Sequence, residues 1–192
     1  MSRYTVAPAW MNTSDTLTSI TTGGIANEIH LQQEMGITSI ALASAFVPTG
    51  ETATIAMAFS GTVTMRFYRV NRHPNFRKTS AYNSKKTGVT ATSASVSVWV
   101  SPLGYAYAVA GVQGAFTSWD APAHLQSING PNETLHTAFA DYNDPTRQFV
   151  DVNFKINKSA SGDIALAAAP FLRRKLTVRW RGRRGGVDPS LR

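Results

Sequence analysis

Apolar and polar residues alternate along much of this chain, which is the pattern of β-strands with one buried face. The longest run begins at Ala53, where apolar residues hold the odd positions as far as Phe67 and small or polar residues hold most even ones, with Gly61 as an interruption. The same alternation recurs over 95–100, 150–156 and 176–181. Shorter strand candidates lie at 38–43, 105–109 and 164–167.

Two segments near the N-terminus lack this alternation. Residues 1–24 are rich in Thr and Ser, show no clear period and end in two glycines, which predicts an extended arm. Residues 25–35 follow, and the i, i+4 spacing of Ile25 and Ile29 predicts a short helix there that Gly36 ends.

Turn-rich stretches at 71–88, 118–131 and 141–145 separate the strand candidates. A chain of 192 residues with many short strands and no internal repeat predicts one all-β domain, a sandwich or a barrel. The long connections favour Greek-key topology, in which strands cross between sheets.

Basic charge is concentrated near the C-terminus. One twelve-residue stretch without any acid holds seven of the 19 Lys and Arg residues, whereas the other 12 basic residues are nearly matched by 11 acidic ones. Such a patch predicts a polyanionic partner, most simply nucleic acid. The seven residues are Arg173, Arg174, Lys175, Arg179, Arg181, Arg183 and Arg184.

The alternation over 176–181 places Arg179 and Arg181 on one face of a predicted strand and Leu176, Val178 and Trp180 on the other. Guanidinium groups can hold phosphate through two hydrogen bonds. Contact with RNA phosphates, ion pairing with carboxylates of a neighbouring subunit, and simple solvation are three interpretations that this pattern leaves open. Nothing in the segment matches a motif that reads bases.

Sites for catalysis and metals are not indicated. The chain has no cysteine, its four histidines share no metal-ligand spacing, and it has neither a Gly-x-Ser-x-Gly elbow nor a phosphate-binding loop. We therefore predict no enzyme activity, no catalytic residue, no metal and no cofactor. No apolar run is long enough to predict a membrane span.

Charged residues make up only 16% of the chain, below the roughly 25% usual in soluble domains. This shortage predicts a surface covered largely by partner subunits.

Several segments resemble strands of the capsid proteins of picorna-like viruses (order Picornavirales). These are small RNA viruses with icosahedral capsids. Residues 58–69 resemble one strand, 147–155 and 161–169 resemble two late strands, and 176–182 resemble the last. The resemblance implies an eight-stranded, two-sheet antiparallel jelly roll with Greek-key topology and one or two short helices. It would divide the chain into an N-terminal arm (1–24), a jelly-roll domain (25–182) and a basic C-terminal tail (183–192).

The resemblance further implies a structural subunit of an icosahedral capsid, located in the virion and, during assembly, in the host cytoplasm. Its partners would be the other capsid proteins of the same virus, packaged genomic RNA bound without sequence specificity, and a host receptor. The alternative is a jelly-roll carbohydrate-binding or fibre-type module, which needs clustered aromatic residues on one face or acidic calcium ligands. A cellular RNA-binding protein is a further alternative, and it would bind RNA as a free monomer.

Overall fold

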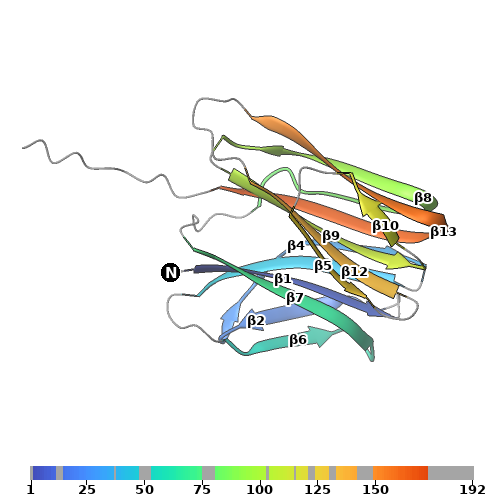
Figure 1. The fold of residues 1–192 in the computed structure, drawn as a ribbon. Helices are drawn as coiled ribbons and strands as arrows, with labels where there is room; N and C mark the ends of the chain where they lie inside the picture. Colours follow the sequence, from blue (N-terminus) through green and yellow to red (C-terminus); the bar gives the residue numbers. More distant parts are fainter. Residues whose placement is uncertain are drawn as a thin grey trace, which may run out of the picture.

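The computed structural model describes residues 2–11, 15–36, 38–47, 53–74, 81–102, 104–114, 116–120, 124–129, 133–141 and 149–172. Within these residues the chain forms strands and no helix (Figure 1). The strands are β1 (Ser2–Met11), β2 (Leu17–Thr22), β3 (Ile25–Ala26), β4 (Glu28–Met35), β5 (Thr38–Val47), β6 (Ile55–Phe59), β7 (Thr64–Pro74), β8 (Lys85–Val100), β9 (Gly104–Gln113), β10 (Phe116–Trp119), β11 (His124–Asn129), β12 (Glu133–Asp141) and β13 (Val150–Leu172).

The described strands form three hydrogen-bonded sheets in which neighbours are antiparallel. One sheet has the order β4-β5-β1-β7, and a small one has the order β3-β2-β6. The largest has the order β10-β13-β9-β12-β11, with β8 also paired to β13. The expectation of an all-β, antiparallel fold is therefore confirmed.

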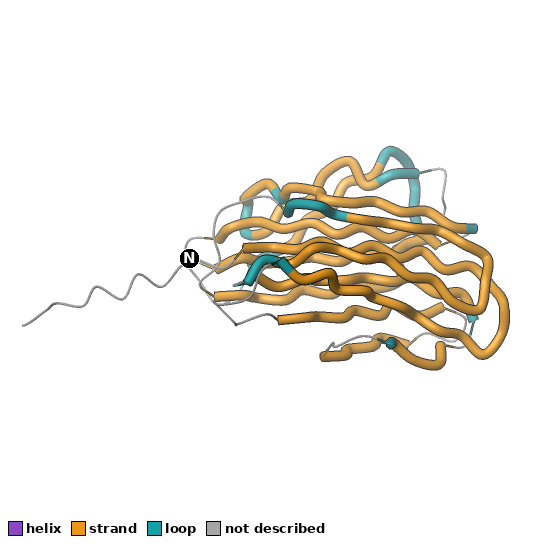
Figure 2. The backbone as a smooth tube through the Cα atoms, turned by 90° about the horizontal axis from the view of Figure 1, so that it is seen from above, coloured by secondary structure: helices purple, strands orange, loops and turns teal. Residues whose placement is uncertain are grey.

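The largest sheet folds back on itself because β13 is long and interrupted. Its register against β8 skips from Asn157 opposite Ser93 to Gly162 opposite Ala91. The two halves of β13 then face each other across one hydrophobic core, in which Phe154 of the first half packs with Leu166 of the second. The folded sheet, the β4-β5-β1-β7 sheet and the small sheet stack as successive layers whose strands run in similar directions (Figures 1 and 2).

The two central layers are buried on both faces. Every residue of β9 from Gly104 to Val112 is buried, as is nearly all of β5. Alternate side chains of β9 pack in different cores. Ala108 packs with the first half of β13, and Val109 packs with β1 and β5. A third core joins the other face of β1 and β5 to the small sheet, with Trp10 at its centre.

Alanine supplies much of this packing. Short side chains suit a strand that must face a neighbouring layer on each side, because the layers can approach closely without voids. The alanines with no exposed surface in these strands are Ala7, Ala41, Ala43, Ala106, Ala108, Ala110, Ala165, Ala167, Ala168 and Ala169.

Most strand predictions are confirmed. The run from Ala53 forms β6 and β7 with Gly61 between them, and the shorter candidates at 38–43, 105–109 and 164–167 lie in β5, β9 and β13. Burial alternates over 95–100 and 150–156 as the sequence predicts. The predicted strand over 176–181 lies outside the described residues.

The predicted helix over 25–35 is wrong, because these residues form β3 and β4. Gly23 and Gly24, with φ of 59° and 77°, make a two-residue turn that joins β2 to β3, and a hairpin of this kind requires left-handed backbone at both positions. The register of β4 shifts between Ile29 and Leu31, so Ile29 packs in one core and Leu31 in the next. The i, i+4 spacing of Ile25 and Ile29 also fits a strand period of two, and the bulge that follows Ile29 hides the alternation in the rest of the segment.

Residues 1–24, predicted to be an extended arm, contain two of these strands. β1 lies between β5 and β7 inside a sheet, and β2 pairs with β3 and β6. Val6 and Trp10 of β1 and Ile20 of β2 are buried in one core. The described part of this segment therefore belongs to the folded body, although its composition is polar.

We predict that Gly111→Ala destabilises the fold by about 1–3 kcal/mol, the usual cost of overpacking a core. A Cβ at this position of β9 would lie 2.5 Å from Thr38 Cγ2 and 2.8 Å from Ile40 Cγ2, across the interface of the two central layers. Chemical denaturation measures the loss. Thr38→Ser removes the nearer methyl group and should restore part of the stability in the double variant; equal stability of Gly111→Ala and the parent chain would contradict this account.

Candidate functional site

The seven basic residues predicted to bind RNA lie outside the described residues, so the structure places none of them. They are Arg173, Arg174, Lys175, Arg179, Arg181, Arg183 and Arg184. The described chain ends at Leu172, directly before the first of them. The structure therefore shows the end of the molecule at which this basic segment begins.

Phe171 anchors that end through contacts with three other strands. Its ring, which has no exposed surface, stacks on Tyr105 of β9 with centroids 5.1 Å apart. The imidazole of His30 on β4 meets it edge-on at 5.1 Å. The guanidinium carbon of Arg3 on β1 lies 4.7 Å from its centroid. We call these four residues, together with Ser44, the Phe171 cluster.

Arg3 is a buried cation held by aromatic faces. Only 2% of the residue is exposed, and its guanidinium lies 4.5 Å from the ring centroid of Phe46 as well as against Phe171. Arg3 Nη1 donates a hydrogen bond of 2.7 Å to Ser44 Oγ. Burial lowers the pKa of Arg3, while the nearby Tyr105 and Glu28 raise it. A guanidinium remains protonated in proteins, so the positive charge persists inside the cluster.

His30 is the second ionisable group of the cluster, and it is neutral at pH 7. Burial of the ring lowers the pKa of His30 to about 4. The charge of Arg3 also lowers this pKa, whereas the charge of Glu28 raises it. His30 Nε2 lies 2.7 Å from Ser44 Oγ. The Ser44 hydroxyl accepts from Arg3, and according to the tautomer of the ring it donates to Nε2 or accepts a second hydrogen bond from it. Nδ1 lies 3.7 Å from the Glu28 carboxylate.

Ser44, His30 and Glu28 are residue types that form hydrolytic triads, but their geometry here serves packing. Ser44 is 4% exposed and its oxygen accepts a hydrogen bond from a cation, which makes it a poor nucleophile. The 3.7 Å separation of Glu28 from the ring exceeds a hydrogen bond. The cluster thus joins β1, β4, β5, β9 and β13.

A second basic segment, residues 64–86, passes through the same end of the molecule, and the comparison of total charges did not reveal it. Residues 52–119 hold seven basic residues and no acid. They are Arg66, Arg69, Arg72, Arg77, Lys78, Lys85 and Lys86. A search for acid-free stretches, rather than for dense basic ones, would have found this segment in the sequence.

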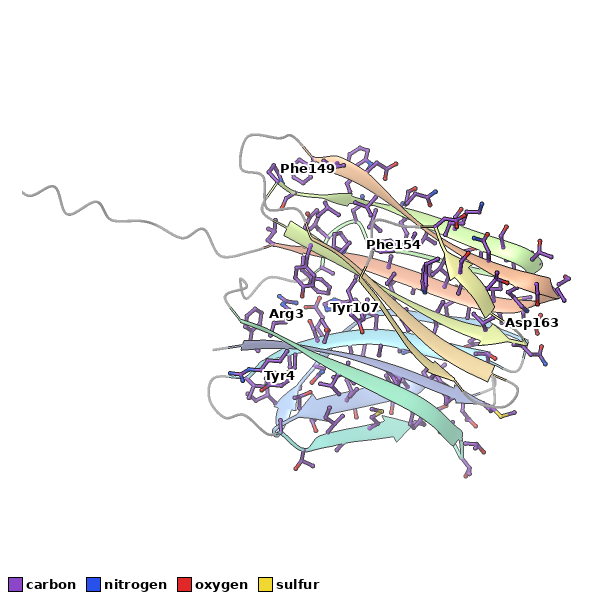
Figure 3. All side chains as sticks on the ribbon, viewed as in Figure 1. Arg3, Tyr4, Tyr107, Phe149, Phe154 and Asp163 are labelled. Carbon is purple, nitrogen blue, oxygen red and sulfur yellow. The ribbon has the colours of Figure 1, made fainter. Side chains whose placement is uncertain are left out.

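The fold brings this segment to the end where β13 stops. Pro74, the last residue of β7, pairs with Ser2, next to Arg3. The backbone N–H of Tyr82 approaches the carbonyl of Pro170 at 3.4 Å, just before Leu172. Arg3 marks this end in Figure 3, whereas the acidic Asp163 lies at the opposite end of the strands. Both acid-free segments therefore enter or leave the folded body close together.

The outer face of β8 and β13 carries two exposed aromatic residues. Trp99 and Phe149 are each 61% exposed and are the exposed large hydrophobic residues of the described chain. Trp99 stands opposite Asp151, and Phe149 contacts Tyr82 edge-on with centroids 6.2 Å apart. The Tyr82 hydroxyl accepts a 2.7 Å hydrogen bond from the backbone N–H of Ser101 and is thereby fixed in place. The alternation over 95–100 already placed Trp99 among the polar positions.

The remainder of this outer face is polar. Ser97 stands opposite Asn153, and Ser95 stands opposite Lys155. Lys155 Nζ pairs with Asp120 at 3.2 Å, and hydrogen bonds from Asn157 and then Lys155 lower the pKa of that carboxyl group. Aromatic rings at one end of a polar, exposed sheet make a surface that can contact a ligand with both apolar faces and hydrogen-bonding groups.

Among the described residues, no group of three or more histidines and acids is arranged to hold a metal ion. The same part of the chain contains no helix of the length and hydrophobicity that a membrane crossing needs. Comparison with protein-family models, curated proteins and solved structures found no match for this chain.

We predict that Ser44→Ala lowers the free energy of unfolding by about 1–3 kcal/mol, because buried Arg3 and His30 each lose a hydrogen-bond partner. Ser39→Ala is the matched control on the same strand. The Ser39 hydroxyl is buried without a hydrogen-bond partner, so its removal should be neutral or stabilising. Urea denaturation of both variants measures the difference, and equal losses would contradict the bridging role of Ser44.

Proposed function

We propose that this chain is a structural subunit of the icosahedral capsid of a small RNA virus, and that its two acid-free basic segments bind packaged RNA. One observation carries the proposal. Residues 64–86 and 173–184 hold fourteen basic residues and no acid. The first segment leaves β7 at Pro74 and returns at Tyr82, at the same end of the β body where β13 leads into the second segment. A body with cationic segments at one end can line the inner surface of a shell while its other surfaces contact neighbouring subunits.

The proposed binding is electrostatic and independent of RNA sequence. Phosphates spaced along a strand are matched by many weak cationic contacts, each of which releases counterions. Arginine suits this role because its planar guanidinium can hold a phosphate through two hydrogen bonds. The absence of a base-reading motif agrees with a partner recognised only as a polyanion.

The layered body supplies the other half of the proposal. Capsid subunits form large, permanent contacts, and a chain in which only 16% of residues are charged fits such contacts. Jelly-roll topology, as the resemblance implies, belongs to the proposal as well. The observation that supports jelly-roll topology is less specific than the topology itself: the strands are antiparallel, and their sheets stack through apolar faces. Other capsid proteins of the same virus would complete the shell.

A second function is favoured by a separate observation. The exposed Trp99 and Phe149, beside Asp151 and Asn153, form the kind of surface on which a sugar ring stacks while its hydroxyls meet carboxylate and amide groups. A carbohydrate-binding module, alone or on a fibre, would use this outer face. The same face could serve a capsid subunit in attachment to a glycan receptor.

We predict that replacing all seven basic residues of 173–184 by glutamine reduces the slope of log K against log salt for single-stranded RNA by about five, at roughly 0.7 per lost phosphate contact. The matched control replaces the six arginines by lysine, which keeps the charge and should keep the slope. Fluorescence anisotropy with a labelled oligonucleotide over a salt series measures both, and circular dichroism confirms that the variants fold.

Sedimentation and electron microscopy of the same preparations measure whether the chain assembles into particles. The proposal expects multi-megadalton particles with the sister capsid proteins, and RNA crosslinks within 64–86 or 173–184. A chain that stays a small oligomer in its native source, with adducts confined to other regions, would overturn it. A monomer that binds RNA with the full salt slope would instead indicate a cellular RNA-binding protein.

For the second function, we predict that Trp99→Ala abolishes binding of a soluble polysaccharide, whereas Ser95→Ala, on the same face but further from the aromatic residues, leaves binding unchanged. The probes are a β-glucan, a mannan and a galactan, and titration calorimetry is the measurement. Phe149→Ala should weaken binding as well. No binding of any probe by the parent chain, or equal binding by Trp99→Ala, would remove this candidate.

A further inference from the structure

The position of His30 in the Phe171 cluster is unusual for an ionisable ring. The bulge between Ile29 and Leu31 places it at the break in the β4 register, and its side chain is 2% exposed. It contacts Ser44 of β5 and Phe171 of β13. The imidazole thus contacts a strand of its own sheet, β5, and the strand of the neighbouring sheet that leads to the basic segment, β13.

The groups around this ring come from five strands. On β4, the Glu28 carboxylate lies 3.7 Å from Nδ1, and its side chain is half exposed. On β1, the charge of Arg3 acts on the ring and opposes a second positive charge. On β5, the hydroxyl of Ser44 is uncharged, and on β9 the buried Tyr105 stacks on the far partner, Phe171 of β13. The Glu28 carboxylate is therefore half in water, while the Arg3 cation is buried.

Protonation of His30 would place the Ser44 hydroxyl between two cations. In the neutral state, Arg3 donates to Ser44 Oγ, and His30 Nε2 is the second partner of that hydroxyl, as donor or acceptor according to the ring tautomer. A protonated ring can only donate. Both Arg3 and His30 would then donate to the same oxygen, and two cations would lie on either side of one buried hydroxyl.

We propose that protonation of His30 in mildly acidic solution opens the Phe171 cluster and releases the C-terminal end of β13 together with the start of β1. The direction of the pH dependence follows from the pKa of His30 in the closed and open states of the cluster. In the closed state the pKa of His30 is about 4, whereas an exposed imidazole titrates near 6.5. Above pH 6.5 neither state takes up the proton, and between pH 6.5 and 4 the open state takes it up preferentially, so closure weakens steadily as the pH falls.

The end of β13 is the part most easily released. Its pairing with β8 stops at Ala168 opposite Lys85, whereas pairing with β9 continues to Leu172 opposite Gly104. The last four residues of β13 thus have a strand ladder on one side, and Phe171 is their buried anchor. The first half of β13, between β8 and β10, packs in a different hydrophobic core from Tyr105 and Phe171 and should stay closed.

The opening of the cluster is independent of the function of the chain. Its consequence rests on the function proposed above: if residues 173–184 bind RNA, acid would release the strand end from which the RNA-binding segment starts. A capsid built from such subunits would loosen its grip on the genome in an acidic compartment. Hydrogen exchange of the RNA-free protein separates these two claims, because it reports the opening whether or not RNA is a ligand.

The test is hydrogen exchange between pH 7.5 and 4.5, read by mass spectrometry and corrected for the intrinsic pH dependence of exchange. In the parent chain, protection of residues 2–6 and 168–172 should fall on the order of tenfold per pH unit between pH 6 and 4.5, while residues 94–100 keep theirs. In His30→Gln, which cannot be protonated, protection at these residues should not vary with pH. His136→Gln on β12 is the control and should behave as the parent chain.

Loss of protection in His30→Gln that matches the parent chain would overturn the proposal, as would constant protection in the parent chain. If His30→Gln does not fold, a nuclear magnetic resonance titration of the His30 ring in the parent chain replaces it. The proposal then expects local opening to coincide with ring protonation. Protonation without any increase in exchange at residues 168–172 would contradict it.

Discussion

The structure depends on close packing between β-layers that are buried on both faces. A strand in such a layer has no side for polar side chains, and its backbone groups must be satisfied by lateral pairing within the sheet. Alanine and glycine on β9 and alanine on the second half of β13 meet this requirement, since they fill the space between layers without forcing them apart. Gly111, where a methyl group would strike Thr38 and Ile40, shows how little space remains.

This packing decides where polar chemistry can lie. With the two middle layers closed to water, functional groups are left to the ends of the strands and to the outer layers. In the Phe171 cluster a charge lies inside the packed region, and Arg3 is accommodated there by two aromatic faces and a hydroxyl. The exposed Trp99 and Phe149 lie on an outer layer, and the two acid-free segments join the body at a strand end.

The alternation of apolar and polar residues predicted strands well where one face meets water. Over 95–100, buried valines alternate with exposed Ser and Trp because the outer layer has a single core face. The prediction failed over 25–35, where a bulge moves the strand from one core to the next, and it missed β1, whose residues 3–10 are buried on both faces and so do not alternate. A period of two cannot reveal a strand that is buried on both faces or one that changes face partway.

The sequence by itself determined the fold class, the scarcity of charge and the composition of the basic segments, because these depend on local pattern and on counting. Only the tertiary structure decided how the layers stack, that Pro74 and Tyr82 lie at the end where β13 stops, and that Arg3, His30, Ser44 and Phe171 meet. These residues are distant in the chain, and their contact follows from strand order and register. Sheet order is fixed by long-range pairing and by the competition of apolar faces for burial, which no local stretch of sequence encodes.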